Sequence, residues 1–394
     1  MTPRANHKQL DPEGQAWIHE LLQERLRLAI QFTLIRVLEA EIEAFVNAEP
    51  YQRTPQRRDY RNGTYPRDLV TTMGVVEDLE VPRTRNGYHT ELFERYQRRQ
   101  TELDEAICEM FVQGISTSQV GNVVEVLSGV HPSPSTVSRV FHSLEEEFEG
   151  WKQRKLKAHY LYVFADGTYF TVIYDENGCK MPILAIVGID EDGRREVLTF
   201  TVGERENQNA WEDALDDLKS RGVERVDLWI TDGNKAMLNA IQIKFPASKR
   251  QRCVKHKMDN VLGYIPEKQQ DDVRPELRAI FYQDSREKAD QELAAFIAKY
   301  EHIYPSAVAC LKRDLEACLT FYSFPDKHWK FIRTTNIIER LFGEVKKRSH
   351  KMAAAFRNEN SCMLMFYAVI RSLKLRRISV PEISTGSLQL LHNS

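Results

Sequence analysis

Three carboxylate residues have the types and positions that a two-metal phosphoryl-transfer site requires. Asp166 and Asp232 each follow an apolar run, at 160–165 and 226–231. Glu339 lies in a segment whose pattern predicts the opening of a helix. Hard oxygen ligands of this kind hold paired Mg²⁺ ions, which activate an attacking oxygen and stabilise a leaving one. The pattern therefore predicts phosphodiester chemistry, the cutting and joining of nucleic-acid strands.

A cysteine and a histidine form a second candidate group, with the Cys-x-x-His spacing of Cys253 and His256. This spacing is half of a typical zinc site, but a tetrahedral structural site needs four ligands. The sequence offers no second Cys/His pair at matching spacing, so structural zinc is the weaker interpretation. Because the pair follows the strand expected after Asp232, we predict that His256 lies beside the active site and contacts a substrate phosphate or base.

The composition bounds the class of protein. A chain of 394 residues is expected to form two to four domains. No apolar run approaches the length of a membrane span, and the first residues lack the basic and apolar pattern of a signal peptide. The six cysteines are scattered without a disulfide spacing. We therefore expect a protein of the reducing cytoplasm with no membrane partner.

The charge distribution indicates a nucleic-acid partner although the formal net charge is only -2. Residues 327–377 contain thirteen Lys or Arg against three Glu, and 244–257 contain six basic residues and no acid. Several such stripes are typical of phosphate contact, whereas any one alone is as readily a solvated helix face. The candidate DNA contacts are Trp329, Arg333, Arg340, Lys346, Lys347 and Arg348. For Trp329 the alternatives are a core position and a platform for an unpaired base.

The first part of the chain is predicted to be mainly helical, with a short β-hairpin. Apolar residues recur at helical spacing over 11–48, and a hairpin is expected over 68–83. Three short helices follow over 102–150, with Ser135 as the cap of the third. They have the pattern of a helix-turn-helix unit, whose third helix would enter the major groove. Its candidate DNA contacts are Ser135, Thr136, Ser138 and Arg139; packing or dimer contact is the alternative.

The middle of the chain has the pattern of a mixed α/β fold. An antiparallel meander is predicted by three apolar segments separated by turn signals, at 160–173, 181–189 and 196–202. A helix over 207–220 and a strand over 226–231 then predict a parallel crossover. Three hairpin strands followed by α-β-α-β is the ribonuclease-H-like arrangement, in which the first and fourth strands are neighbours. Asp166 and Asp232 are therefore expected to meet at adjacent strand ends.

The segment 266–330 is helical in pattern and exceeds what such a core needs, so we predict an inserted helical subdomain. The predicted regions are an N-terminal helical region for dimerisation or DNA binding (1–50), an Arg-rich β-hairpin region (51–100), a helix-turn-helix DNA-binding domain (101–155), the first part of the ribonuclease-H-like core (156–265), the helical insertion (266–330), the last part of the core with the Glu339 helix (331–378) and a C-terminal tail (379–394).

Nearly the whole chain resembles the bacterial insertion-sequence transposases related to the Mutator superfamily. The most specific stretches are DGTYF (166–170), GRREVL (193–198), WEDALDDLKSRG (211–222), QRCVKH (251–256) and HWKFIRTTNIIERL (328–341). The resemblance implies a DDE transposase whose metal-binding triad is Asp166, Asp232 and Glu339. It also implies that Cys253 and His256 are the C-x-x-H element that this group shares with hAT-type transposases.

The expected cofactor is two Mg²⁺ ions, for which Mn²⁺ can substitute. The implied partners are double-stranded DNA, namely the terminal inverted repeats of the element and a target duplex. Because two DNA ends must be paired, we expect a homodimer or a higher homo-oligomer, in a bacterial cytoplasm and associated with the nucleoid when bound to DNA. The chain departs from many relatives by having Asp232-Gly-Asn-Lys-Ala236 in place of Asp-x-His-x-Gly. That departure concerns substrate positioning and removes no metal ligand.

Two other functions fit the same residues. One is a ribonuclease-H-like nuclease that hydrolyses DNA without joining it, since both activities use the same carboxylates. The other is a domesticated DNA-binding regulator, which would not need an intact triad. A strand-transfer assay with pre-cleaved ends separates the nuclease, and the effect of Asp166→Ala on biological activity separates the regulator.

Overall fold

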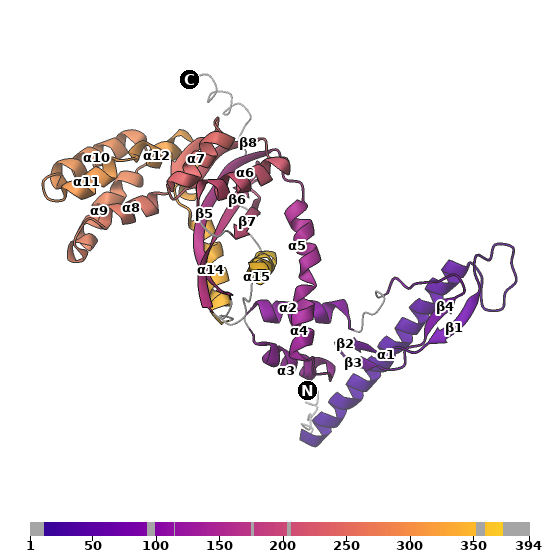
Figure 1. Ribbon diagram of the computed structural model, residues 1–394. Helices are drawn as coiled ribbons and strands as arrows, with labels where there is room; N and C mark the ends of the chain where they lie inside the picture. Colours follow the sequence, from indigo (N-terminus) through magenta and orange to yellow (C-terminus); the bar gives the residue numbers. More distant parts are fainter. Residues whose placement is uncertain are drawn as a thin grey trace, which may run out of the picture. The chain divides into compact units, whose positions relative to one another are not determined.

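The computed structural model places the chain in two units, divided between residues 143 and 144 (Figure 1). The residues that it describes are 12–92, 99–113, 115–174, 177–202, 206–351 and 359–372. Each unit has hydrophobic clusters of its own. Among the described residues, every helix is too short or too polar to span a bilayer.

The first unit begins with a long helix, α1 (Pro12–Val46), that packs on two small sheets. The sheets are antiparallel pairs: β1 (Arg61–Tyr65) with β4 (Val81–Thr84), and β2 (Leu69–Thr71) with β3 (Gly74–Val76). Leu38 of α1 is buried in a cluster with Val76, Leu79 and Val81. This cluster joins the helix to both sheets, because Val76 belongs to β3 and Val81 to β4.

The hairpin predicted over 68–83 forms, but it is shorter than predicted. Gly74 has a φ of 115°, a conformation that favours glycine and lets the chain reverse between β2 and β3. The second half of the predicted hairpin does not form one strand but is divided between β3 and β4. The chain turns at Asp78, where φ is 49°, and β4 then pairs with β1 instead.

Three helices complete the described part of the first unit and pack on one another: α2 (Thr101–Val112), α3 (Thr117–Ser128) and α4 (Pro134–His142). Ser116 caps α3 through a capping box with Gln119, and Gly129 ends it with a φ of 69°. The predicted cap of the third helix, Ser135, is wrong. Ser133 caps α4 by accepting a hydrogen bond from the Thr136 amide, because Pro134 fits the first helical position.

The second unit is built on a five-stranded mixed sheet with the strand order β7-β6-β5-β8-β9. Its strands are β5 (His159–Tyr174), β6 (Asn177–Ile189), β7 (Arg195–Val202), β8 (Arg225–Thr231) and β9 (Lys249–Arg252). The first three are antiparallel neighbours, as the predicted meander requires, and β8 pairs parallel with β5. The predicted turn at 190–193 forms, with Gly193 at a φ of 73°. The other predicted turn includes residues 175 and 176, outside the described residues.

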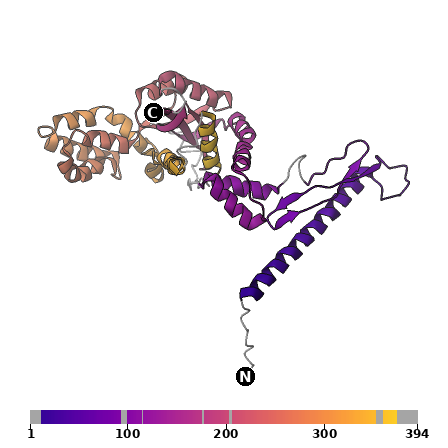
Figure 2. The same cartoon turned by 60° about the horizontal axis from the view of Figure 1, so that its bottom comes forward.

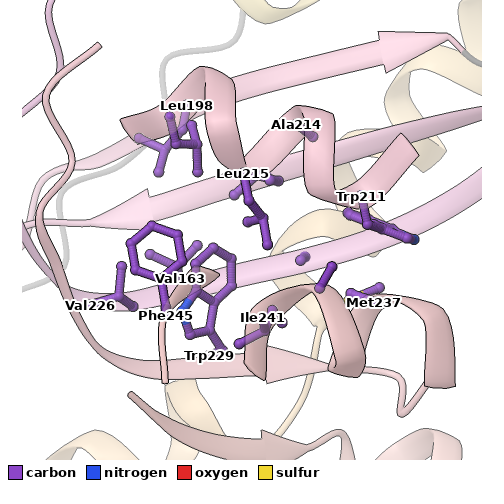
Figure 3. Close-up of a cluster of buried hydrophobic side chains, with 14 of the residues drawn as sticks. Val163, Leu198, Trp211, Ala214, Leu215, Val226, Trp229, Met237, Ile241 and Phe245 are labelled. Carbon is purple, nitrogen blue, oxygen red and sulfur yellow. The ribbon is translucent and has the colours of Figure 1, made fainter. Parts of the chain in front are cut away.

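Helices α6 (Gln208–Ser220) and α7 (Lys235–Lys244) cover one face of this sheet (Figure 3). Trp211 and Leu215 of α6 pack with Trp229 of β8, and Ile241 of α7 joins the same cluster. Helix α6 begins at the cap Asn207 and ends before Gly222, as its sequence pattern predicts. The strands are buried on both faces, which explains their nearly continuous apolar runs.

The opposite face of the sheet carries an aromatic cluster with α5 (Leu144–Gln153), α14 (Asn336–Lys351) and α15 (Glu359–Ser372). Phe366 of α15 lies between Phe170 of β5, Phe200 of β7 and Phe342 of α14. Tyr162 of β5 donates or accepts a 2.6 Å hydrogen bond with His328. Tyr162 and Phe170 of β5 therefore both face this side, as alternating strand side chains an even number of residues apart should.

The remaining helices of the second unit lie between β9 and α14, and most gather in one group beside the sheet (Figures 1 and 2). They are α8 (Val254–Leu262), α9 (Glu267–Phe281), α10 (Arg286–Tyr300), α11 (Pro305–Lys312), α12 (Leu315–Leu319), the 3-10 helix η1 (Thr320–Ser323) and α13 (Asp326–Ile332). Leu277, Phe281 and Phe296 are among their buried residues. The segment 266–330 is thus helical, as its apolar spacing predicts.

Candidate active site

Asp166 and Asp232 lie on neighbouring parallel strands. The register pairs Phe164 of β5 with Ile230 of β8, and β8 ends one residue later. Asp232 follows directly, so both aspartates come two residues after this pair. The expectation that Asp166 ends its strand is wrong, because β5 continues to Tyr174 in pairing with β6. Asp166 instead lies where β5 loses its partner β8, which leaves one edge of the strand open for ligands.

The Asp166 carboxyl group is buried at 7% exposure and has unusual electrostatics. Its pKa is raised to about 7, chiefly by burial and also by the negative charge of Asp232. Charge on His256 and a 2.9 Å hydrogen bond from the Gly167 amide to Oδ1 act in the opposite direction. The charge of Glu339 also contributes to the rise, so the two other predicted acids both influence the Asp166 carboxyl group. Like charges gathered in a buried place are typical of a cation site.

Glu339 reaches this place from the first turn of α14, which packs on β5 and β6 (Figure 1). Its carboxylate accepts a hydrogen bond from Lys255 Nζ and one of 3.3 Å from Thr335 Oγ1. His256 Nε2 lies 4.0 Å from Glu339 Oε1. Further along α14 towards its C-terminus, Lys346 Nζ donates to Thr168 Oγ1 of β5 at 2.6 Å. These contacts hold α14 along β5 beside Asp166.

Cys253 and His256 connect the end of the sheet to the start of the Glu339 helix. The Cys253 amide donates to the Thr231 carbonyl at 2.7 Å, which fixes the cysteine beside the end of β8. Its Sγ accepts 3.3 Å hydrogen bonds from the amide and the hydroxyl of Thr335, the residue before α14. The predicted position of His256 beside the acids agrees with its 4.0 Å approach to Glu339. A contact with substrate stays a prediction.

Cys253 and His256 shift each other's pKa in opposite directions. Burial raises the pKa of Cys253, but hydrogen bonds from His256 and Thr335 outweigh it and lower that pKa overall. The hydrogen bond with Cys253 raises the pKa of His256 to about 9, although burial opposes the rise. At neutral pH the imidazole is therefore positively charged next to Glu339. This arrangement places a fixed positive charge at the rim of the acidic group.

Two overlapping sets of side chains could hold metal ions. Asp166, Asp232 and Glu339 offer hard carboxylate oxygens, the ligands that Mg²⁺ and Mn²⁺ prefer. The raised pKa of Asp166 fits such an ion, because a divalent cation would relieve the repulsion between the acids. Ligand atoms of Cys253, His256 and Glu339 lie within 4.8 Å of one another. That mixed set of sulfur, nitrogen and oxygen suits Zn²⁺ instead.

Three residues near the acids were not singled out by the motifs. Lys255 pairs with Glu339, and Asn234 donates from its backbone amide to Asp232 Oδ1 at 2.8 Å. Glu206 accepts from the Asn234 side chain at 2.8 Å. Burial raises the pKa of Glu206, and the charge of Asp232 adds to it. The Cys-x-x-His pattern contains Lys255, and the stretch from Asp232 to Ala236 contains Asn234, whereas Glu206 gives no chemical signal in the sequence beyond the neighbouring helix start.

The predicted DNA contacts on α13 and α14 fall into two groups. Arg340, Lys346 and Lys347 are exposed on α14. The other three make hydrogen bonds within the protein. Arg348 donates to Glu344 at 2.6 Å, Trp329 to the Phe324 carbonyl at 2.7 Å, and Arg333 to the Phe281 carbonyl at 3.1 Å. The indole of Trp329 also meets two aromatic rings edge-on. Base stacking by Trp329 stays a prediction, and packing is the role with contacts in its favour.

The predicted contacts on α4 lie near its start. Ser135, Ser138 and Arg139 are exposed, and Thr136 is half-buried. Ser135 Oγ lies 2.8 Å from the cap hydroxyl of Ser133. Val137 and Val140 are buried on the opposite side of the helix. An exposed polar side on a helix anchored by its apolar side is compatible with groove entry, which stays a prediction.

Comparison with known proteins gives a consistent result. Residues 4–376 match the family described as Transposase, Mutator family. The transposase for insertion sequence element ISRM5 of Rhizobium meliloti (strain 1021) is 36% identical over 345 residues, which cover 87% of this chain and 86% of the relative. The transposase for IS905 of Lactococcus lactis subsp. lactis (strain IL1403) is 31% identical, with 86% of each chain covered. That for IS256 in transposon Tn4001 of Staphylococcus aureus is 32% identical, covering 86% of this chain and 87% of the relative.

These similarities show that the protein is of the insertion-sequence transposase class. The chain belongs to the Mutator family of transposases, and the resemblance seen in its motifs is confirmed. A solved structure, the Drosophila P element transposase strand transfer complex, aligns with 72% of this chain and 94% of its own, at 10% identity and a TM-score of 0.40. That similarity is too low to carry an argument about fold or function.

Proposed function

We propose that this chain is a Mg²⁺-dependent DDE transposase that cleaves DNA at the ends of its insertion sequence and joins the freed ends to a target. The observation that carries the proposal is that the parallel register of β5 with β8 and the packing of α14 on β5 bring Asp232 and Glu339 to the side of the buried Asp166, whose pKa they raise. Membership of a transposase family supports the reaction class. The strand order β7-β6-β5-β8-β9, with β5 and β8 adjacent and parallel, supports a ribonuclease-H-like core.

The three acids would hold two divalent ions. Bound Mg²⁺ or Mn²⁺ would supply an activated oxygen nucleophile and would stabilise the leaving oxygen. Asp166 and Asp232 are held from two adjacent strands, and Glu339 closes the group from α14. Asn234 orients the Asp232 carboxylate by donating its backbone amide. Thr335 orients Glu339 in the same way, through its hydroxyl group.

Basic residues next to the acids would bind the substrate phosphate. His256, charged at neutral pH because its pKa is about 9, and Lys255 both lie beside Glu339. In the absence of a bound ion Lys255 neutralises Glu339, and with an ion bound its ammonium group becomes available to a phosphate oxygen. The exposed Arg340, Lys346 and Lys347 would contact the DNA backbone along α14.

The other predicted regions would serve DNA binding and assembly. The helices α2, α3 and α4 would recognise the terminal inverted repeats, together with the Arg-rich segment that precedes them. Helix α1, with exposed apolar residues such as Trp17 and Phe32, would support a homodimer or a higher homo-oligomer. The predicted organisation into seven regions, with a helical insertion at 266–330, stays part of this proposal.

The decisive experiment is a cleavage and strand-transfer assay on DNA that carries the inverted repeats of the element. Asp166→Asn, Asp232→Asn and Glu339→Gln are each expected to abolish both steps while specific DNA binding persists, since metal ligation and groove contacts use different residues. Hydrolysis without joining by the unchanged protein would identify a nuclease instead. Full activity of any of the three variants would overturn the assignment of the triad.

A further inference from the structure

Glu206 lies against the strand that carries Asp166. It precedes Asn207, the cap of α6, and its side chain is half-buried. A Cβ atom at Gly167 would lie 2.9 Å from Glu206 Cδ and 3.0 Å from each of its carboxylate oxygens. Such distances are too short for an alanine unless Glu206 moves. Glycine at 167 therefore makes room for the Glu206 carboxylate one residue after Asp166.

Glu206 lies on the face of β5 opposite to the Asp166 side chain. Ala165 belongs to the cluster under α6 and α7, and Gly167 shares its side because strand residues alternate. Asp166 therefore faces the other side, where α14 supplies Glu339. An acid behind the strand is poorly placed to share an ion with Asp166. A hydrogen-bonded connection from Glu206 to the acids therefore runs through another residue.

That residue is Asn234, whose side-chain oxygen and nitrogen both form hydrogen bonds. Its Oδ1 caps α7 by accepting from the Ala236 amide at 2.9 Å and the Met237 amide at 3.4 Å. The Nδ2 group must then point away from the helix, and it donates to Glu206 Oε1 at 2.8 Å. The backbone amide of the same residue donates to Asp232 Oδ1 at 2.8 Å. A chain of hydrogen bonds thus runs from Glu206 through Asn234 to Asp232.

We propose that Glu206 is a positioning residue of the active site, which fixes the loop 232–234 through Asn234 and so holds the Asp232 carboxylate in the orientation that a metal ion needs. This inference rests on the proposed function. A carboxylate is a stronger acceptor for the Asn234 amide than a neutral group, and partial burial protects the bond from water. Glu206 therefore acts by offering an acceptor oxygen to Asn234, and it does not need to bind a metal ion itself.

The test separates these two properties in the full-length protein. Glu206→Ala removes the acceptor, whereas Glu206→Gln keeps an acceptor oxygen but loses the charge. We expect Glu206→Ala to raise the Mg²⁺ concentration for half-maximal DNA cleavage about tenfold, and Glu206→Gln to stay within about threefold of the unchanged protein. Glu224→Ala, which removes an exposed acid of the same unit, is the matched control and should leave the Mg²⁺ dependence unchanged.

A second variant, on β5, tests the same hydrogen bond between Asn234 and Glu206. Gly167→Ala should push the Glu206 carboxylate away, because the new Cβ would occupy its position. It is expected to reproduce the Mg²⁺ effect of Glu206→Ala. Combining the two changes should cost little more than either alone, since both remove one hydrogen bond. The thermal midpoint and the affinity for inverted-repeat DNA, measured for every variant, show whether each protein is folded.

The outcomes decide between the possibilities. If Glu206→Ala binds DNA, is folded and shows unchanged Mg²⁺ dependence while Asp232→Asn is inactive, the inference is wrong and the proposed function stands. If Glu206→Gln loses as much as Glu206→Ala, an acceptor oxygen without the negative charge is not sufficient, and the assignment of the role to the acceptor oxygen is overturned. If the unchanged protein lacks metal-dependent cleavage altogether, the proposed function itself fails.

Discussion

The raised pKa of Asp166 has a consequence for stability. Its ordinary pKa is 3.8 and its pKa in the folded protein is about 7, so the folded state binds a proton that the unfolded state releases. The folded protein therefore loses stability as the pH rises from about 4 to about 7, and the loss is complete above that range. A neutral residue at this position avoids the loss.

Asp166→Asn is therefore expected to stabilise the metal-free protein at pH 8 and to have little effect at pH 4. The gain above pH 7 has an upper limit of about 4 kcal/mol, from a shift of about 3 units at 1.36 kcal/mol each. Denaturant unfolding with a chelator present, at both pH values, measures it. Saturating Mg²⁺ should narrow the gap, because only the unchanged protein keeps the full set of ligands. An equal gain at both pH values would contradict this account.

The mixed ligand set of Cys253, His256 and Glu339 predicts sensitivity to zinc. If Zn²⁺ binds these three residues, Glu339 is withdrawn from the proposed Mg²⁺ site, and we expect cleavage to stop. Cys253→Ser should raise the Zn²⁺ concentration for half-inhibition by at least about tenfold, because zinc favours the thiolate. Inhibition curves at constant Mg²⁺ measure the change. Cys310→Ser, at another buried cysteine, is the control, and equal curves for both variants would exclude the site.

At the scale of elements, the start of α14 determines where Glu339 lies. The Thr335 amide donates to Cys253 Sγ, and the Thr335 hydroxyl lies 3.3 Å from both Cys253 Sγ and Glu339 Oε1, to either of which it can donate its one hydrogen. Thr335→Ser keeps the hydroxyl, whereas Thr335→Val keeps the shape and loses it. We expect Thr335→Val to lower the cleavage rate about ten- to hundredfold at saturating Mg²⁺, with Thr335→Ser close to the unchanged protein.

The comparison needs a measure of folding, because Thr335 is fully buried. Loss of a buried hydroxyl partner costs about 1–3 kcal/mol, which a denaturant titration detects. A variant that is destabilised by that amount but cleaves DNA at the normal rate would show that the hydroxyl serves only the fold. The cleavage rates of the Thr335 variants should therefore be compared at temperatures well below their unfolding midpoints.

The elements with one strong local pattern could be predicted from the sequence. The strands β5, β6, β7 and β8 and the helix α6 follow from apolar runs, turn residues and the cap Asn207. The pairing of β5 with β8 followed from the order of elements, and with it the approach of Asp166 to Asp232. The extension of β5 beyond Asp166 agrees with the apolar segment predicted at 160–173, but it contradicts the placement of Asp166 at a strand end, because the backbone continues to pair with β6 after the acid.

The contacts that support the acids could not be predicted, because they join residues distant in the sequence. Glu206 and Asn234 are 28 positions apart, and Lys255 and Glu339 are 84 apart. No periodicity links such pairs before the sheet brings them together. The correct cap of α4, Ser133, was missed for a local reason. Pro134 is itself a good first helical residue, so the helix begins earlier than Ser135 would allow.

At the scale of the whole molecule, the division between residues 143 and 144 predicts that the two units can be separated. The second unit contains the five-stranded sheet, the three acids and the helices that support them. We expect the fragment 144–394 to fold cooperatively and to bind Mn²⁺ with an affinity within about threefold of the full chain. Circular dichroism and a Mn²⁺ titration followed by paramagnetic relaxation measure these properties.

The same fragment should lose its preference for inverted-repeat DNA. The helices proposed to read base edges belong to the first unit, whereas the exposed lysines and arginine of α14 are proposed to contact only the DNA backbone, which carries no sequence information. Its binding to repeat and random duplexes should therefore become equal and remain steeply dependent on salt. Electrophoretic mobility assays with both duplexes at two salt concentrations test this. A fragment that still prefers the repeats would place sequence recognition in the second unit and would remove the role assigned to α4.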